Sequence, residues 1–254
     1  MIQRRQAMQP ANDGEWVLPP KISEAVIRIL RHEVGDLLQT VYSAAAVLNQ
    51  RLPAGWELER RVVGDMRTRG ETCRRYLDYT HDLVCALRIT KERFEAGDSL
   101  TDLLKQIASR HPSVRVHLEV AAKLAANADP QKLESVFHLL TTFACESATD
   151  EAWVQIKPGK EPFSLDAVIE HDGEEVSAES CEALLGLLNS GQNARSRLGL
   201  LLAQKLIQLH GGCLMVMPRG GGGMRLCIHL PGEDNTPTSS QCNGSIDFRG
   251  LIAD

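Results

Sequence analysis

A stripe of apolar residues near the N-terminus constrains the fold more than any other feature of this 254-residue chain. Its members recur at steps of three or four residues: Ile27, Leu30, Val34, Leu38, Val41, Ala45 and Leu48. This spacing places them along one side of an α-helix. We therefore predict a long helix over residues 21–50, ended by the turn-forming residues at 52–55.

A second long helix is predicted to follow that turn. Residues from Glu57 to about Ala96 carry another stripe at helical spacing: Val62, Met66, Cys73, Leu77, Val84 and Leu87. Two long helices joined by a tight turn form an antiparallel hairpin. Because a hairpin cannot enclose its own stripe, we expect a homodimer in which residues 21–97 of two chains form a four-helix bundle.

The composition excludes several classes of protein. The net charge is −5 with both signs mixed, which argues against nucleic-acid and membrane-surface partners. No apolar run approaches the roughly 18 residues of a membrane-spanning helix. Residues 1–20 are interpreted as a polar leader without a secretory signal. The seven cysteines lack CxxC spacing, so we expect reduced thiols in the cytoplasm and no metal site.

The pattern changes to mixed helices and strands after Gly97-Asp98. Helices are predicted over 99–109, 130–147, 177–188 and 198–210, and strands over 114–118, 153–156, 163–169, 213–217 and 225–230. Asp129 is a favourable N-cap before Pro130, and Ser99 and Ser177 are expected to cap their own helices. The chain is therefore predicted to be α+β, with a second domain over 98–231 and a tail over 232–254.

One histidine on the first predicted helix has the features of a reactive group. His32 precedes Val34 by two residues, which places it about 200° around the helix from that residue. It therefore faces outward, with Glu33 beside it. An exposed histidine next to a carboxylate can exchange a proton or a phosphoryl group near neutral pH. The pair is also typical of an ordinary surface histidine. Other features of the chain are needed to distinguish a reactive histidine from an ordinary one.

The order of these parts resembles the cytoplasmic core of two-component histidine kinases over residues 21–231. Four segments carry the resemblance: His32-Glu33-Val34-Gly35-Asp36-Leu37-Leu38 (the H-box), 129–136 (the approach to the N-box), 198–212 with Leu209-His210-Gly211-Gly212 (the second glycine box and its helix), and 222–231 (the closing strand). The resemblance implies a helical-hairpin dimerisation and phosphotransfer domain. It also implies a following Bergerat-type α/β sandwich, in which helices cover a mixed sheet.

The nucleotide site departs from the family pattern. The resemblance implies two asparagines on the N-box helix, one of which holds Mg²⁺, but Leu139 and Phe143 stand there without oxygen ligands. His171 replaces the aspartate that accepts the adenine amino group, and Glu175 replaces a glycine of the first glycine box. We therefore expect a degenerate nucleotide site and no cofactor.

The resemblance implies phosphotransfer without ATP as the first function. His32 would receive a phosphoryl group from a response-regulator receiver domain and pass it on, acting as a nucleophile. Glu33 would orient the imidazole and take its proton. Asp36 lies one helical turn from His32, where family members with phosphatase activity carry Asn or Thr.

Two other functions stay open at this point. The chain can be a divergent ATP-dependent histidine kinase that binds ATP and Mg²⁺ through Asp172, Gly173 and Gly199. Its sensor input would then come from another chain, because the leader is too short to hold one. Alternatively, the chain is a non-catalytic pseudokinase scaffold that binds a response regulator.

Overall fold

The computed structural model describes residues 20–53, 55–184 and 194–232. It divides into two compact units, Met1–Leu87 and Arg88–Asp254, which are described separately below. The predicted leader apart from Pro20, and the predicted tail apart from Gly232, lie outside the described residues. No helix in the described ranges is long and apolar enough to cross a bilayer.

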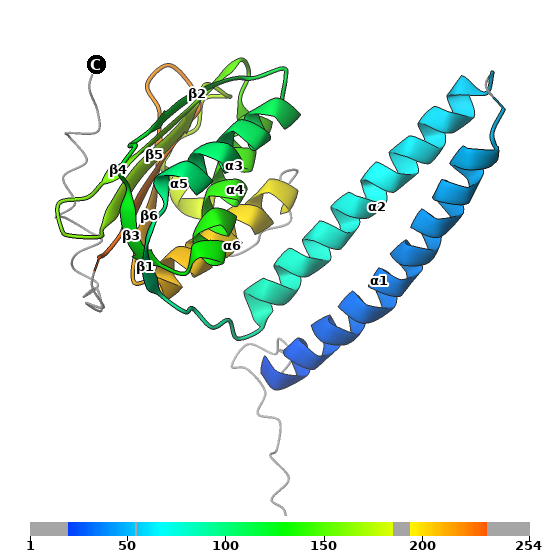
Figure 1. Cartoon of the computed structure of the whole chain (residues 1–254), viewed down its shortest axis with the longest axis horizontal. Helices are drawn as coiled ribbons and strands as arrows, with labels where there is room; N and C mark the ends of the chain where they lie inside the picture. The colour runs from blue at the N-terminus through cyan, green and yellow to red at the C-terminus, as the bar shows by residue number, and fades with distance from the viewer. Residues whose placement is uncertain (1–19, 54, 185–193, 233–254) are drawn as a thin grey trace, which may run out of the picture. The chain divides into compact units, whose positions relative to one another are not determined.

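The first unit is a hairpin of two long helices, α1 (Pro20–Arg51) and α2 (Glu57–Val84) (Figure 1). Leu38 and Ala45 of the predicted stripe are buried between them. Gly70 of α2 is buried against Tyr42 of α1, and a Cβ at Gly70 would lie 2.8 Å from the Tyr42 ring. The two helices therefore approach closely because a glycine faces a tyrosine.

The prediction that the second helix continues to Ala96 is wrong. It ends at Val84, and Cys85 is already extended. The chain then forms a short strand, β1 (Glu92–Glu95), which pairs antiparallel with β3 (Ala125–Ala128). Glutamate and arginine favour helices locally, but the long-range pairing overrides that preference. Neither strand was predicted from the sequence. The two compact units divide between Leu87 and Arg88, before the expected boundary at Gly97.

The second unit is built on a mixed five-stranded sheet within the described residues. The strand order is β2-β4-β5-β7-β6. The strands are β2 (Arg115–Val120), β4 (Glu151–Pro158), β5 (Leu165–His171), β6 (Cys213–Pro218) and β7 (Met224–Leu230). The pair β2–β4 is parallel and the other neighbours are antiparallel. The predicted α+β arrangement with a mixed sheet is confirmed for this unit.

The helices of this unit lie on one face of the sheet (Figure 1). They are α3 (Gly97–Arg110), α4 (Pro130–Ser147), α5 (Ala178–Leu184) and α6 (Ala194–Leu209). Alternate residues of β4, namely Ala152, Val154 and Ile156, are buried, which is the period-two pattern of a sheet covered on one face. Residues 185–188 of the helix predicted over 177–188 lie outside the described residues.

Two predicted caps are confirmed and one is wrong. Asp129 accepts a hydrogen bond from the Lys132 N–H at the start of α4, and Ser177 accepts one from the Ser180 N–H at the start of α5. Helix α3 instead begins at Gly97, and the Ser99 hydroxyl donates back to the Ala96 carbonyl. Ser99 therefore lies inside the first turn rather than at its N-cap.

A glycine turn joins β6 to β7, as the sequence predicted. Gly221, Gly222 and Gly223 have φ values of 90°, 103° and 83°, which glycine adopts without steric cost. The Gly223 N–H donates to the Glu174 carbonyl, and a Cβ at Gly223 would overlap the His171 carbonyl oxygen. This turn therefore packs against the segment that follows β5.

Candidate functional site

His32 lies on the exposed side of α1, with 72% of its side chain accessible. Its Nδ1 atom is 3.4 Å from an Asp36 carboxylate oxygen and 3.8 Å from a Glu33 carboxylate oxygen. Asp36, one helical turn further along, is therefore nearer than the adjacent Glu33. Sequence reasoning assigned the orienting role to Glu33, although the i, i+4 spacing is the one that brings helical side chains together.

This arrangement leaves one imidazole nitrogen available for chemistry. Carboxylates on the Nδ1 side favour the tautomer with its proton on Nδ1, so the Nε2 lone pair is free to attack. Both separations exceed a normal hydrogen-bond length, and such contacts often tighten when a reacting group binds. The exposed Nε2 is therefore suited to act as a nucleophile toward a group on a second protein.

The two positions where the resemblance implies asparagines are part of the hydrophobic core. Leu139 and Phe143 lie on α4 and are each 5% exposed. Neither side chain offers a ligand to a hard cation. Residues that the resemblance places around a metal and a nucleotide are here packed as apolar core residues.

His171, at the end of β5, is also buried, at 1% exposure. Its ring meets the Phe143 ring edge to face, with centroids 6.1 Å apart. The Gly173 N–H donates to His171 Nδ1 at 3.1 Å, so the ring proton lies on Nε2, which has no hydrogen-bond partner among the described residues. Burial, with Arg219 nearby, lowers the pKa of His171 despite the opposing charge of Asp172.

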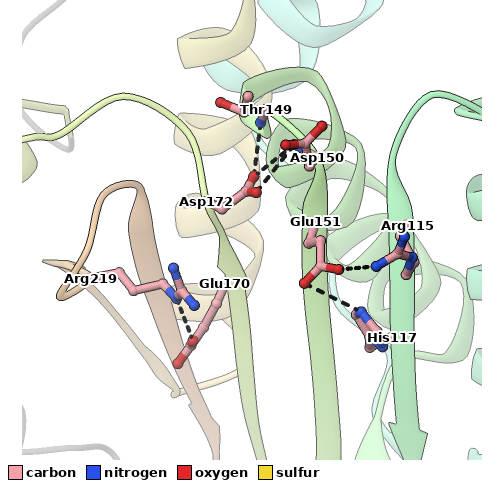
Figure 2. Close-up of polar contacts among 8 residues, drawn as sticks. All are labelled: Arg115, His117, Thr149, Asp150, Glu151, Glu170, Asp172 and Arg219. Atoms are coloured by element: carbon pink, nitrogen blue, oxygen red, sulfur yellow. Dashed lines mark hydrogen bonds and ion pairs between the residues drawn. The ribbon is translucent and has the colours of Figure 1, made fainter.

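The Asp172 carboxylate accepts hydrogen bonds from backbone N–H groups at the connection between α4 and β4 (Figure 2). One carboxylate oxygen accepts from the Thr149 N–H at 2.9 Å and from the Asp150 N–H at 3.0 Å. Partial burial acts to raise the pKa of Asp172, but the backbone N–H donors outweigh it and lower the pKa. These bonds tie the end of β5 to the start of β4. The Asp172 carboxylate thus has hydrogen-bond donors from the protein itself, without a bound nucleotide.

The remaining sequence candidates for ATP binding have packing roles. A Cβ at Gly173 would overlap the carbonyl oxygen of Ser147 in the last turn of α4, so only glycine allows this approach. Glu175, where the resemblance implies a glycine, forms a backbone bridge with Gly223. Gly199 is buried within α6.

A row of ion pairs on the sheet was missed by sequence reasoning (Figure 2). Arg219 contacts Glu170 at 3.2 Å and lies 4.5 Å from the centre of the Trp153 ring, against which His117 stacks. Glu151 pairs with Arg115 and lies 3.7 Å from His117. Only the strand register brings these residues together, so no local pattern indicates them.

Comparison with known proteins assigns the class of the second unit. Residues 128–234 match the family model described as histidine kinase-, DNA gyrase B- and HSP90-like ATPase. The matched range begins at the end of β3, includes α4 and α6, and extends past the closing strand β7. Residues 128–234 are therefore similar to the ATPase domain of histidine kinases.

Particular relatives are sensor histidine kinases. The chain is 21% identical over 207 residues to sensor histidine kinase ZraS of Escherichia coli O157:H7, covering 79% of this chain and 44% of that protein. ZraS of Salmonella typhimurium is 23% identical over 205 residues, with the same coverage. The chain thus spans less than half the length of the curated relatives it matches.

Solved structures share the fold. Full-length ShkA in complex with AMPPNP superimposes with a TM-score of 0.67 at 14% identity, covering 84% of this chain and 46% of that one. Acinetobacter baumannii histidine kinase AdeS gives a TM-score of 0.56 at 14% identity, covering 78% of this chain and 96% of that one. At these identities the likeness concerns the fold alone.

Proposed function

We propose that this chain is a two-component signalling protein that carries a phosphoryl group on His32, in exchange with the aspartate of a response-regulator receiver domain, without hydrolysing ATP itself. One contrast supports the proposal. His32 is exposed with carboxylates at its Nδ1 atom, whereas Leu139 and Phe143 are buried at the positions where the family holds Mg²⁺. Phosphoryl transfer from ATP depends on positioning and charge neutralisation, and both require the metal.

The proposed step uses His32 as the nucleophile. The Nε2 lone pair attacks the phosphorus of the receiver's acyl phosphate, and the P–O bond breaks with its electron pair returning to the receiver carboxylate. The Nδ1 proton stays on the ring, where Asp36 and Glu33 stabilise the positive charge that develops. The reverse reaction passes the group to a second receiver.

Self-association is part of this proposal. Both helices of the hairpin carry exposed apolar side chains: Ile29, Leu30, Leu37, Val47 and Leu48 on α1, and Leu58, Val62 and Met66 on α2. Exposed apolar residues in this number mark an interaction surface. We propose that a second hairpin covers them in a four-helix bundle.

A second candidate function is ATP-dependent kinase activity. The match of residues 128–234 to an ATPase family supports it, as does the fold shared with ShkA. In this case ATP and Mg²⁺ are used, and Gly173 and Gly199 border the nucleotide.

Two radiolabel transfers on the wild type and on His32→Ala test these functions. One uses Mg-ATP as donor and the other uses a panel of phosphorylated receiver domains. We expect acid-labile label on the wild type from a receiver only, and none on His32→Ala. Label from ATP that vanishes in the variant would establish the kinase instead. Label from neither donor would leave a scaffold that binds a response regulator without chemistry.

A further inference from the structure

A hollow of about 370 Å³ lies beside His32 on the hairpin. Residues of both helices line it: Arg28, Arg31, His32, Gly35, Asp36 and Gln39 from α1, and Arg74 from α2. The lining therefore includes three arginines and one acidic residue, Asp36. Guanidinium groups are always charged and carry only hydrogen-bond donors, so the hollow favours an anion.

The arginines differ in how they are held. Arg31 Nε lies 2.7 Å from an Asp78 carboxylate oxygen, an ion pair that joins α1 to α2. This contact uses Nε and leaves the terminal nitrogens of the guanidinium as further donors. Within the described part of the chain, no ion pair involves Arg74. Its charge is therefore available to a bound anion.

Gly35 is a second, independent observation. It lies inside α1, where glycine costs about 1 kcal/mol relative to alanine. A Cβ built at Gly35 would meet no atom within 4 Å, so packing within this chain does not require glycine. Glycine at this open position leaves room for a ligand to approach the helix backbone closely.

We infer that this hollow is a binding site for the phosphoryl group carried by His32, in which Arg28, Arg31 and Arg74 neutralise its charge. The inference rests on the proposed function, because it assumes that His32 is the phosphoryl carrier. A phosphoryl group on Nε2 carries up to two negative charges, and arginine binds such groups through paired hydrogen bonds. The hollow then has two effects: it lowers the barrier to transfer and stabilises the phosphorylated histidine.

The test uses phosphoramidate, a small phosphodonor that needs neither ATP nor a receiver. His32 Nε2 forms the new N–P bond, the donor's P–N bond breaks, and the protonated nitrogen of the donor leaves as ammonia. The full chain is incubated with radiolabelled phosphoramidate, and the rate of acid-labile labelling at His32 is measured. His32→Ala sets the background.

Three variants distinguish an effect of the hollow from a general effect of removing positive charge. Arg74→Gln is expected to slow labelling about tenfold, which corresponds to about 1.4 kcal/mol. Arg75→Gln removes the same charge from the neighbouring exposed residue, which does not line the hollow, and is expected to keep the wild-type rate. Gly35→Ala is expected to raise the melting temperature and yet slow labelling, because its methyl group enters the hollow.

Each outcome decides the inference. Slower labelling in Arg74→Gln and Gly35→Ala, with Arg75→Gln unchanged, supports the site. Equal rates in Arg74→Gln and the wild type overturn it, as does a wild type that phosphoramidate does not label. Transfer from phosphorylated receivers, measured on the same variants, tests the proposed function separately. If phosphoramidate labels His32 but no phosphorylated receiver does, the proposed function is refuted, while the inference that the hollow binds a phosphoryl group still holds.

Discussion

The Nε2 atom of His210 accepts a hydrogen bond from the backbone N–H of Asp129, over 3.1 Å. Its Nδ1 donates to the Leu206 carbonyl over 2.8 Å, and the residue is 2% exposed. Asp129 is the N-cap of α4, so the imidazole joins the end of α6 to the start of α4. The histidine of the Leu209-His210-Gly211-Gly212 motif therefore has a structural role that needs no nucleotide.

This relationship predicts a pH-dependent stability. Burial, with Lys91 nearby, lowers the pKa of His210, and burial also lowers the pKa of His171. Below the ordinary value of 6.5, the unfolded chain binds protons that the folded chain does not. Stability is therefore fully present above this value and is lost as the pH falls through and below it. Thermal melts between pH 8 and 5 measure the effect.

The variant His210→Phe isolates the contribution of this ring. Without the acceptor, the part-buried Asp129 N–H loses its partner, at a cost of about 1–3 kcal/mol at pH 8. The variant is also expected to lose less stability than the wild type between pH 8 and 5, because one of the two buried histidines no longer titrates. An identical pH dependence in both proteins would contradict this assignment.

Gly173→Ala is expected to destabilise the second unit by about 1–3 kcal/mol, because its methyl group would overlap the Ser147 carbonyl oxygen. Urea unfolding without nucleotide measures the loss. Gly220→Ala is the matched control, since a Cβ there meets nothing within 4 Å and its φ is not in the left-handed region. Equal stability of the two variants would show that Gly173 is not needed for packing.

Leu139 and Phe143 are predicted to act as core residues rather than as remnants of an open pocket. Leu139→Ala is expected to cost about 2–5 kcal/mol and Phe143→Ala about 3–5 kcal/mol in unfolding free energy. Leu209→Ala, at a side chain that is 40% exposed, should cost clearly less. Comparable losses in all three variants would argue against a filled pocket.

Mg-ATP is expected to leave the melting temperature of the wild type unchanged. A ligand present at 100 times its Kd would add about 2.7 kcal/mol of stability, which thermal melts detect readily. A clear rise with Mg-ATP would mean that the second unit still binds nucleotide, and would favour the kinase alternative.

Dimerisation is predicted to depend on the apolar face of the hairpin. Leu37 and Leu58 are 63% and 69% exposed in the single chain, and burial of each would contribute about 1.5–3 kcal/mol. Leu37→Glu is therefore expected to weaken self-association about a hundredfold or more, as measured by sedimentation equilibrium. Gln50→Glu, at an exposed polar position of α1, should leave the dimer intact. A monomeric wild type would refute the bundle.

Local patterns in the sequence were sufficient for much of this fold. The apolar steps from Ile27 to Leu48 predicted α1, and Asp129-Pro130 predicted the start of α4. Both features depend on residues within one or two helical turns of each other. The outward position of His32 follows from the same helical geometry, because the stripe at Val34 and Leu38 must face a partner.

Long-range contacts decided the rest. The end of α2 at Val84 and the pairing of β1 with β3 depend on residues distant in the sequence, which outweigh the helical preference of Glu92–Glu95. Asp172 is directed to the Thr149 and Asp150 amides only because β5 ends beside the α4–β4 connection. The hollow beside His32 likewise exists because Arg74 of α2 lies opposite Arg28 and Arg31 of α1. The sequence alone determined which residues can carry chemistry, since residue type and helical period are local. Only the tertiary structure decided which of them are exposed, buried or already bonded, since those properties depend on which distant segments pack together.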